Sequence, residues 1–308
     1  MVLSSKYNVV VVGEGLSGTV IDLEGGVVSK MYLPTSFHDA SIHRNRESHF
    51  LRHLDLPTLK TPKYIAEVQA SNGNEPSIPT LTMHEIKGDF RSHDDVLAAG
   101  SVDSYASLGQ QVGHVLAELH AAKPPRFRFD KQKSVLEMMV DQAEDFDMKA
   151  SDRREFYSDI CRKVRDMEAT VMPVFCHGDM NFGNVVFEEG TDKITGVIDY
   201  AFSGYGMPET DFLHLNVEGL LPEVIDTYEA QTGRAFSEDR LKTVMLVNNM
   251  RGLVAIENML SGDLEKEARE YLEEDQRMCI TDMNTIAQEL GMRVSPSIGF
   301  VPGAFDRK

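Results

Sequence analysis

The chain has 308 residues, of which 31 are Lys or Arg and 49 are Asp or Glu, so its formal net charge at pH 7 is −18. A chain this acidic is poorly suited to bind nucleic acid or an anionic membrane surface, although it would tolerate a cationic small molecule. Its length allows a sizeable core, in one large bilobal unit or in two domains. Three cysteines without C-x-x-C spacing, no signal-peptide core and no stretch long enough to span a bilayer predict a cytoplasmic protein.

The first predicted elements are strands around a glycine-rich loop. Tyr7 to Val12 is rich in β-branched residues and leads into a G-x-G-x-x-G segment formed by Gly13, Gly15 and Gly18. This spacing opens a helix in dinucleotide-binding folds, but two further glycines follow too soon here, and the flanking residues alternate as in strands. The segment therefore predicts a hairpin, either an ordinary one or the loop with which a kinase covers the phosphates of its nucleotide.

A lysine and a glutamate follow at positions that suit the same interpretation. Lys30 lies on the third predicted strand, where a kinase places the lysine that holds the α- and β-phosphates. A single lysine on a strand more often only faces solvent. Residues 37–54 have helical periodicity, and Glu47 in this helix could pair with Lys30, although Arg44 and Arg46 compete for the same glutamate.

The next elements complete the predicted sheet and begin a helical region. Residues 65–68 and 79–86 have the composition of strands, and Lys87-Gly88-Asp89 then suggests a hinge. Backbone groups from His84 to Ile86 could meet the edge of an adenine at this hinge. Helices are expected over 101–122, 131–149, 151–170 and most of 210–292, followed by an irregular tail over 295–308.

The most informative stretch runs from Phe175 to Tyr200. A short apolar run precedes His177, and two further apolar runs around a polar turn predict a β-hairpin after Asn184. This arrangement places Asp179 and Asn184 in one loop. Because the hairpin turns back on itself, it should return Asp199 close to Asn184.

These three side chains suit phosphoryl transfer. That reaction needs Mg²⁺ on the phosphate oxygens and a carboxylate that orients the attacking hydroxyl. Asn184 and Asp199 could supply the oxygen ligands that Mg²⁺ prefers, which leaves Asp179 as the base. A turn in which Asp, Asn and Gly only shape the backbone would explain each residue alone, but it does not explain the three together at this spacing.

The same segments carry a family resemblance. His177-Gly178-Asp179, followed after four residues by Asn184, resembles the catalytic loop of the aminoglycoside phosphotransferase family, which are small-molecule kinases with a protein-kinase-like fold. Ile198-Asp199-Tyr200, with Gly-Met-Pro-Glu-Thr-Asp-Phe after it, is similar to the second motif of that family. The resemblance covers residues 7–290. It implies an α+β bilobal fold, with a small antiparallel-sheet N-lobe over 1–87 and a larger, mainly helical C-lobe over 88–308.

The resemblance also implies a role for each candidate residue. Asp179 would be the catalytic base on a loop braced by His177, and Asn184 and Asp199 would be the magnesium ligands. The nucleotide, ATP, would be held by Gly13, Gly15, Gly18, by Lys30 with its partner Glu47, and by backbone groups of His84 and Ile86.

Two departures from the family pattern bear on the acceptor. Met180-Asn181-Phe182 replaces the Leu-His-Pro of many members, and the segment after Asp199 is rich in glycine and short of carboxylates. Members that modify aminoglycosides tend to present acidic residues to their polycationic substrate. Antibiotic modification therefore does not follow from the motifs, since the family also includes kinases of choline, homoserine and methylthioribose.

We expect an ATP-dependent kinase that phosphorylates a hydroxyl of a small metabolite or an aminoglycoside-like acceptor. A nucleotide-binding regulator without turnover would keep every motif. A metal-dependent hydrolase with His177, Asp179, Asp199 and Asp211 as ligands would leave the glycine-rich hairpin and Lys30 unexplained.

Overall fold

The computed structural model divides the chain into two compact units, and each is described by itself. The first unit comprises residues 1–129, 174–204 and 214–235, and the second comprises 130–173, 205–213 and 236–308. The structure describes residues 10–15, 18–23, 25–32, 40–70, 78–99, 102–128, 133–147, 150–215, 220–262 and 265–292.

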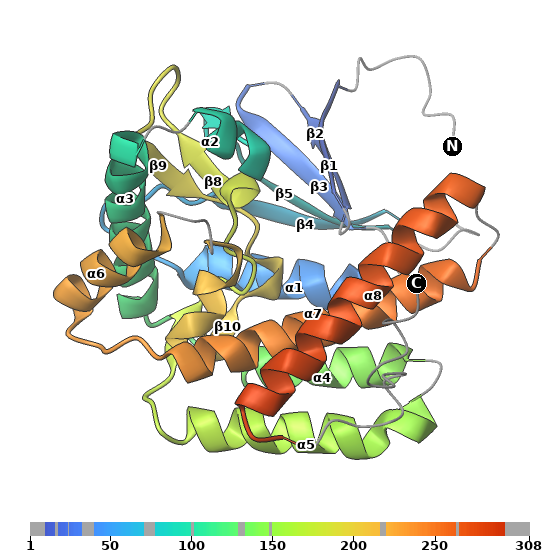
Figure 1. Ribbon diagram of the computed structural model, residues 1–308. Helices are drawn as coiled ribbons and strands as arrows, with labels where there is room; N and C mark the ends of the chain where they lie inside the picture. The colour runs from blue at the N-terminus through green and yellow to red at the C-terminus, as the bar shows by residue number, and fades with distance from the viewer. Residues whose placement is uncertain are drawn as a thin grey trace. The chain divides into compact units, whose positions relative to one another are not determined.

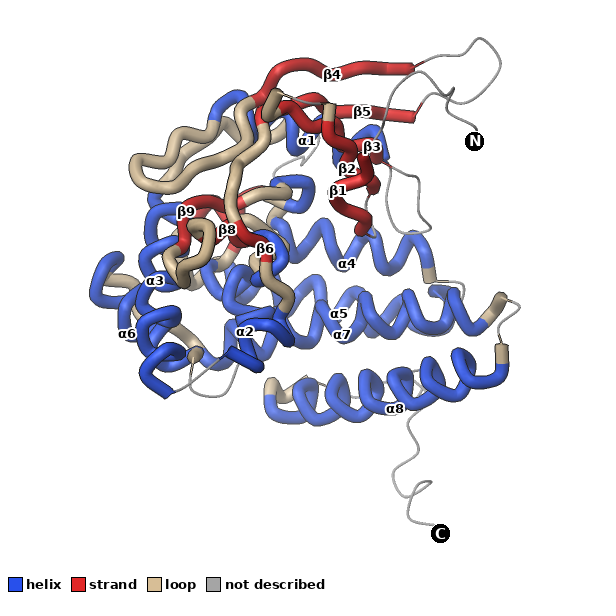
Figure 2. The backbone as a smooth tube through the Cα atoms, turned by 90° about the horizontal axis from the view of Figure 1, so that it is seen from above, coloured by secondary structure: helices blue, strands red, loops and turns tan. Residues whose placement is uncertain are grey.

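A five-stranded antiparallel sheet forms the beginning of the first unit (Figures 1 and 2). Its strand order is β1-β2-β3-β5-β4, with β1 at Val10–Gly15, β2 at Gly18–Asp22, β3 at Val27–Tyr32, β4 at Tyr64–Ala70 and β5 at Ile78–His84. Gly25 and Gly26 both have positive φ in the turn between β2 and β3, a conformation that glycine adopts without steric cost. Helix α1 (Ala40–His53) packs against β3, β4 and β5.

The remainder of the first unit joins a second small sheet to two packed helices. Strands β6 (Asp89–Phe90), β8 (Val185–Phe187) and β9 (Ile194–Val197) form a three-stranded antiparallel sheet. Helix α3 (Val102–Ala121) packs on α6 (Leu221–Thr232) and on β7 (Val174–Cys176). The buried face of α3 consists of apolar residues at helical spacing: Leu108, Val112, Val115, Leu116 and Leu119. The unit also contains α2 (His93–Ala99) and the short 3₁₀ helices η1 (Phe182–Asn184) and η2 (Tyr200–Phe202).

The second unit is mainly helical. Helix α4 packs against α5 and α7, and α7 runs along α8 (Figure 1). Their bounds are Val135–Phe146 for α4, Ala150–Glu168 for α5, Glu238–Leu260 for α7 and Lys266–Glu289 for α8. The 3₁₀ helix η3 covers Pro208–Leu215 and the short strand β10 covers Gly204–Gly206. Ser134 and Glu137 form a capping box that fixes the start of α4.

A buried ionic cluster lies inside the second unit. Arg153 is 4% exposed and contacts Asp147 at 3.5 Å and Glu257 at 2.7 Å. The Tyr157 hydroxyl also donates a hydrogen bond to Asp147. This one guanidinium therefore compensates two carboxylates, that of buried Asp147 and that of partly buried Glu257.

The expected α+β architecture is confirmed, with a small antiparallel sheet followed by a largely helical C-terminal part. The predicted strand over 79–86 ends earlier, at His84, because this residue pairs with Val27, where the partner strand β3 begins. Strand β6 and helix α2 were not predicted from the sequence, and both are short. The expected tail over 295–308 lies outside the described residues. In the described part of the chain, no helix is long and apolar enough to cross a bilayer.

Candidate active site

His177 fixes the loop between β7 and β8 through hydrogen bonds of both its ring nitrogens. This side chain is fully buried, and its Nε2 donates to the carbonyl of Ile198 at 2.8 Å. Its Nδ1 accepts from the Asp179 amide at 3.3 Å, so both ring nitrogens are engaged within the protein. Ser203 Oγ donates to the His177 carbonyl at 2.9 Å, and the Tyr200 ring packs edge-on at 5.0 Å. These contacts tie the loop to residues 198–203.

Gly178 makes the close approach between these segments possible. Its φ is +83°, and a Cβ at this position would lie 2.3 Å from the carbonyl oxygen of Phe202. A side chain would therefore strain the backbone and also collide with it. The glycine of the His-Gly-Asp triplet is thus required by packing as well as by the turn.

Asp179 is held by two asparagines. Asn184 Nδ2 donates to the Asp179 carbonyl at 2.8 Å and to its Oδ2 at 3.1 Å, while Asn181 Nδ2 donates to Oδ1 at 3.1 Å. His214 Nε2 lies 3.9 Å from the same Oδ1. Burial and the nearby charge of Asp199 raise the pKa of the Asp179 carboxyl, and the opposing effects of nearby histidines and of the Asn184 hydrogen bond do not cancel this rise.

The hairpin returns Asp199 to the end of the same loop. The Ile198 amide donates to the Asn184 carbonyl at 3.0 Å, and Val185 pairs with Val197 in the β8–β9 ladder. Asp199 follows directly, with φ 65° and ψ 71°, and among the described residues it is the one non-glycine with positive φ. The expected proximity of Asn184 and Asp199 is therefore present.

Lys30 lies between two carboxylates. Its Nζ is 2.6 Å from Asp199 Oδ1 and 3.0 Å from Glu47 Oε2. Burial lowers the pKa of the Lys30 ammonium, but the charges and hydrogen bonds of Asp199 and Glu47 raise it by more than burial lowers it. The pKa is therefore above its usual value, and Lys30 remains a cation. Burial acts against ionised Asp199 too, but Lys30 outweighs it and keeps the pKa of that carboxyl below its usual value.

Glu47 is fixed by more than the lysine. The carboxylate is 1% exposed, accepts the Tyr32 hydroxyl at Oε2, and accepts the Tyr200 amide at Oε1 at 3.3 Å. Burial raises the pKa of the Glu47 carboxyl despite the opposing effect of Lys30. Arg44 and Arg46, which the sequence offered as competing partners for this glutamate, make contacts elsewhere.

Those two arginines lie on other faces of α1. Arg44 contacts Glu67 at 3.8 Å, and Arg46 lies over the Phe127 ring at 5.5 Å. Neither therefore replaces Lys30 as the cation beside Glu47.

The glycine-rich segment is a pair of strands and not the start of a helix. Gly13 and Gly15 lie on β1 and Gly18 begins β2, with Gly15 opposite Gly18 and Gly13 opposite Val20. The register is irregular between Val11 and Gly13, as in a β-bulge. Residues 16 and 17, at the tip of the loop, lie outside the described residues.

Backbone hydrogen bonds reduce the number of groups at residues 84–86 that could contact an adenine. The His84 amide donates to Lys63 O at 2.8 Å and is therefore used within the β4–β5 region of the sheet, while the predicted contact of the other backbone groups with an adenine stays a prediction. Within the described part of the chain, the Ile86 amide makes no hydrogen bond. The Ile86 amide thus stays a candidate for the contact with adenine.

Asp211, predicted to be structural, is buried in the second unit.

Three residues around the site were not found from sequence. Tyr32 follows Lys30 at the strand spacing that puts both side chains on one face, which could have indicated a contact. Asn181 was noted only as a departure from the family pattern. His214 lies far along the chain from Asp179, and no sequence pattern connects the two.

Comparison with known proteins agrees with this geometry. A profile of the phosphotransferase enzyme family, known as APH, matches residues 9–243, which is most of the chain. The chain therefore belongs to the APH phosphotransferase family, and the resemblance drawn from its motifs is confirmed. Among curated proteins, none matches the sequence.

Solved structures of the family share the fold. The GDP complex of aminoglycoside 2′-phosphotransferase-IIIa has a TM-score of 0.61 and 17% identity, over 88% of this chain and 93% of that chain. The streptomycin–ATP complex of APH(2″)-IIa has a TM-score of 0.52 and 18% identity, over 79% and 85%. APH(3″)-Id from Streptomyces rimosus has a TM-score of 0.53 and 16% identity, over 76% and 89%. At such identities these likenesses establish the kinase-like fold.

Proposed function

We propose that the protein transfers the γ-phosphoryl group of ATP to a hydroxyl of a small molecule. The observation that carries the proposal is the set of contacts that joins Asp179 to Asn184, Asn184 to the strand before Asp199, and Asp199 to Lys30. Phosphoryl transfer needs positioned charges more than covalent chemistry, and this set supplies a base, two oxygen donors and a cation. Family membership supports the same reaction class.

The donor set fits Mg²⁺ and a nucleotide. Asn184 uses its Nδ2 to hold Asp179, which leaves its side-chain oxygen, Oδ1, for a metal. Asp199 uses Oδ1 for Lys30 and the Ala201 amide, which leaves Oδ2. One amide oxygen and one carboxylate are a usual protein contribution to Mg²⁺, since the ion keeps waters and phosphate oxygens as its other ligands. Bound there, Mg²⁺ would neutralise charge that develops on the phosphates.

Each remaining group would have a defined task. Asp179 would accept the proton or hydrogen bond of the acceptor hydroxyl, because Asn181 and Asn184 hold its carboxylate in place. Lys30 would reach the α- and β-phosphates from its position beside Glu47, and the strand amides around Gly13, Gly15 and Gly18 would cover them. The Ile86 backbone would face the adenine. In this proposal residues 1–87 form the nucleotide-binding lobe and 88–308 the catalytic and acceptor-binding lobe.

The acceptor in this proposal is a small metabolite or an aminoglycoside-like compound. The net charge of −18 favours a cationic acceptor, and solved relatives were captured with kanamycin, streptomycin or gentamicin. A screen of ATP consumption against aminoglycosides, amino alcohols, sugars and nucleosides would identify the compound.

The proposal is tested by removing single carboxylates. Asp199→Ala and Asp179→Ala should each lower kcat about 10²–10³-fold, because preorganised electrostatic groups of this kind are worth roughly 3–4 kcal/mol. Asp192→Ala is the matched control, since its side chain is 69% exposed at the turn of the same hairpin, and it should keep full activity. Turnover that survives Asp199→Ala would refute the metal assignment.

The same assays separate the alternatives. Thermal stabilisation by ATP without product, across the whole acceptor screen, would favour a regulator without turnover. The hydrolase alternative needs His177 as a metal ligand, whereas both ring nitrogens of His177 are hydrogen-bonded within the protein. Bound zinc in the purified protein, with no effect of ATP on melting, would favour it nevertheless.

A further inference from the structure

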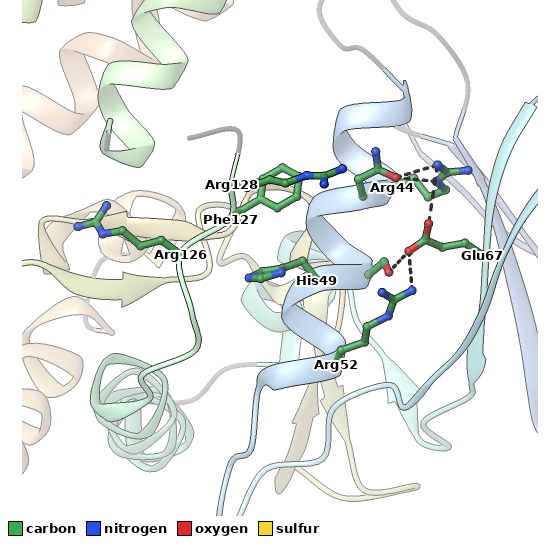
Figure 3. Close-up of a pocket in the computed structure, with 9 residues that line it drawn as sticks. Arg44, His49, Arg52, Glu67, Arg126, Phe127 and Arg128 are labelled. Atoms are coloured by element: carbon green, nitrogen blue, oxygen red, sulfur yellow. Dashed lines mark hydrogen bonds and ion pairs between the residues drawn. The ribbon is translucent and has the colours of Figure 1, made fainter. Parts of the chain in front are cut away.

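A cavity of about 510 Å³ opens between α1, β4 and the segment after α3, all within the first unit (Figure 3). Its volume lies in the range of small-molecule sites, roughly 300–1,000 Å³. Nine residues line it, and four of them are arginines: Arg44, Arg52, Arg126 and Arg128. Nothing in the proposed phosphoryl transfer uses this cavity.

The charge of the cavity is opposite to that of the chain. The sequence carries 49 acidic against 31 basic residues, yet Glu67 is the one carboxylate among the nine described residues that line the cavity. Four guanidiniums against one carboxylate leave an excess of three positive charges. Gathering like charges in a partly enclosed space is unfavourable, and an anion that binds there relieves the repulsion.

The single carboxylate, that of Glu67, already has several partners within the protein. Glu67 accepts from Arg52 at 2.8 Å, from the Ser48 hydroxyl, and lies 3.8 Å from Arg44. Arg52 also lies over the Tyr64 ring, at 4.0 Å from its centroid. These contacts hold two guanidiniums in fixed positions on one wall, which is the preorganisation that bidentate recognition of an oxyanion requires.

The opposite wall comes from residues 126–128. Figure 3 shows Arg128 directed towards Arg44 and α1, and His49 projecting from α1 towards the segment that carries Arg126. His49 is itself fixed, because Nε2 is bonded to the Pro125 carbonyl at 2.8 Å. Arginines thus approach the cavity from both sides.

We propose that this cavity is a binding site for a small, multiply charged oxyanion, such as a phosphate ester or a polycarboxylate. Planar guanidiniums match the oxygens of phosphate and carboxylate, and several of them select a ligand with more than one negative charge. The site is separate from the phosphate-binding groups proposed above, because Glu47 leaves α1 towards Lys30, whereas Arg44 and Arg52 leave it towards Glu67 on β4.

The test is calorimetric titration of the full chain with pyrophosphate and, separately, with citrate, at low salt. We expect one anion to bind, and Arg52→Gln and Arg128→Gln each to weaken it about tenfold. Glu67→Gln should strengthen binding several-fold, because it removes the one competing negative charge. Stronger binding of pyrophosphate would identify a phosphate ester, and stronger binding of citrate a polycarboxylate.

The exposed pair on α8 provides matched controls. Arg277 and Glu274 contact each other and are 48% and 59% exposed, so Arg277→Gln and Glu274→Gln make the same charge changes away from the cavity. Each should change affinity less than twofold, and circular dichroism should show every variant folded. Equal effects at the controls, or no binding of either anion, would overturn the proposal. The proposal would also be overturned if the double variant Arg52→Gln, Arg128→Gln still bound the anion and a non-hydrolysable ATP analogue displaced it. The anion would then occupy the nucleotide site.

Discussion

Replacing Glu47 by Gln tests whether the Lys30–Glu47 pair supports both the fold and the site. At 3.0 Å and an effective dielectric of about 20, the attraction is roughly 5–6 kcal/mol, part of which the burial of both charges offsets. Removing one partner of a buried pair costs about 3–5 kcal/mol, and we expect the lower end because Asp199 still holds the ammonium at 2.6 Å. Glu47→Gln should therefore lower the free energy of unfolding by about 3 kcal/mol.

Urea unfolding measures this loss, and a double-mutant cycle assigns it. Tyr32→Phe removes the hydroxyl that donates to Glu47, and a hydrogen bond to a charged group is worth about 1.5–3 kcal/mol. The two substitutions should therefore be coupled by about 1–2 kcal/mol. Glu188→Gln is the control, because its side chain is 50% exposed and its 3.7 Å contact with Lys193 should contribute less than about 1 kcal/mol. A loss at Glu47 no larger than that at Glu188 would refute the reasoning.

Three further outcomes follow from the described contacts. Burial raises the pKa of Asp179, so kcat/KM should fall as the pH drops through this raised value, and a profile flat down to about pH 4, the usual range of an aspartate, would contradict the role of ionised Asp179 as base. Gly178→Ala should destabilise the protein by more than about 2 kcal/mol in urea, because the new Cβ meets Phe202 O, whereas Gly190→Ala, with positive φ but open space, should cost only about 1 kcal/mol. Arg153→Gln leaves buried Asp147 and partly buried Glu257 without their cation, so we expect a loss of roughly 3–5 kcal/mol in the same assay, and a loss below about 1 kcal/mol would show that they are otherwise compensated.

Local patterns explain how much of the fold was predictable. The apolar spacing of α3 places it almost to the residue, because a buried face repeats every three or four positions. The glycine pair after β2 identified strands and not a helix, because tight turns need positive φ. Helix α2 and strand β6 have seven and two residues, too few for a period to be recognised.

The site was predictable where it lies within one stretch of sequence. Asn184 and Asp199 flank a hairpin whose strands and turn are evident, so their proximity follows from local pairing. Two contacts depend on how distant segments pack, and no local pattern encodes them. One is the contact of His214 with Asp179, and the other is the hydrogen bond from the His84 amide to Lys63 O. The arginine cluster around Glu67 was not predicted either, because its arginines come from α1 and from the segment after α3, while Glu67 lies on β4.

The left-handed backbone at Asp199 has a consequence for sequence drift. A non-glycine residue in this conformation costs on the order of 1–3 kcal/mol, a strain that glycine would relieve, but glycine would also leave the Lys30 ammonium without this partner. Asparagine would also tolerate the geometry, yet without the charge that holds Lys30. Losing one partner of a buried charge pair costs about 3–5 kcal/mol, which exceeds the backbone strain, so stability alone retains the carboxylate. Gly or Asn at position 199 is therefore expected only in chains that have also lost the cation at position 30.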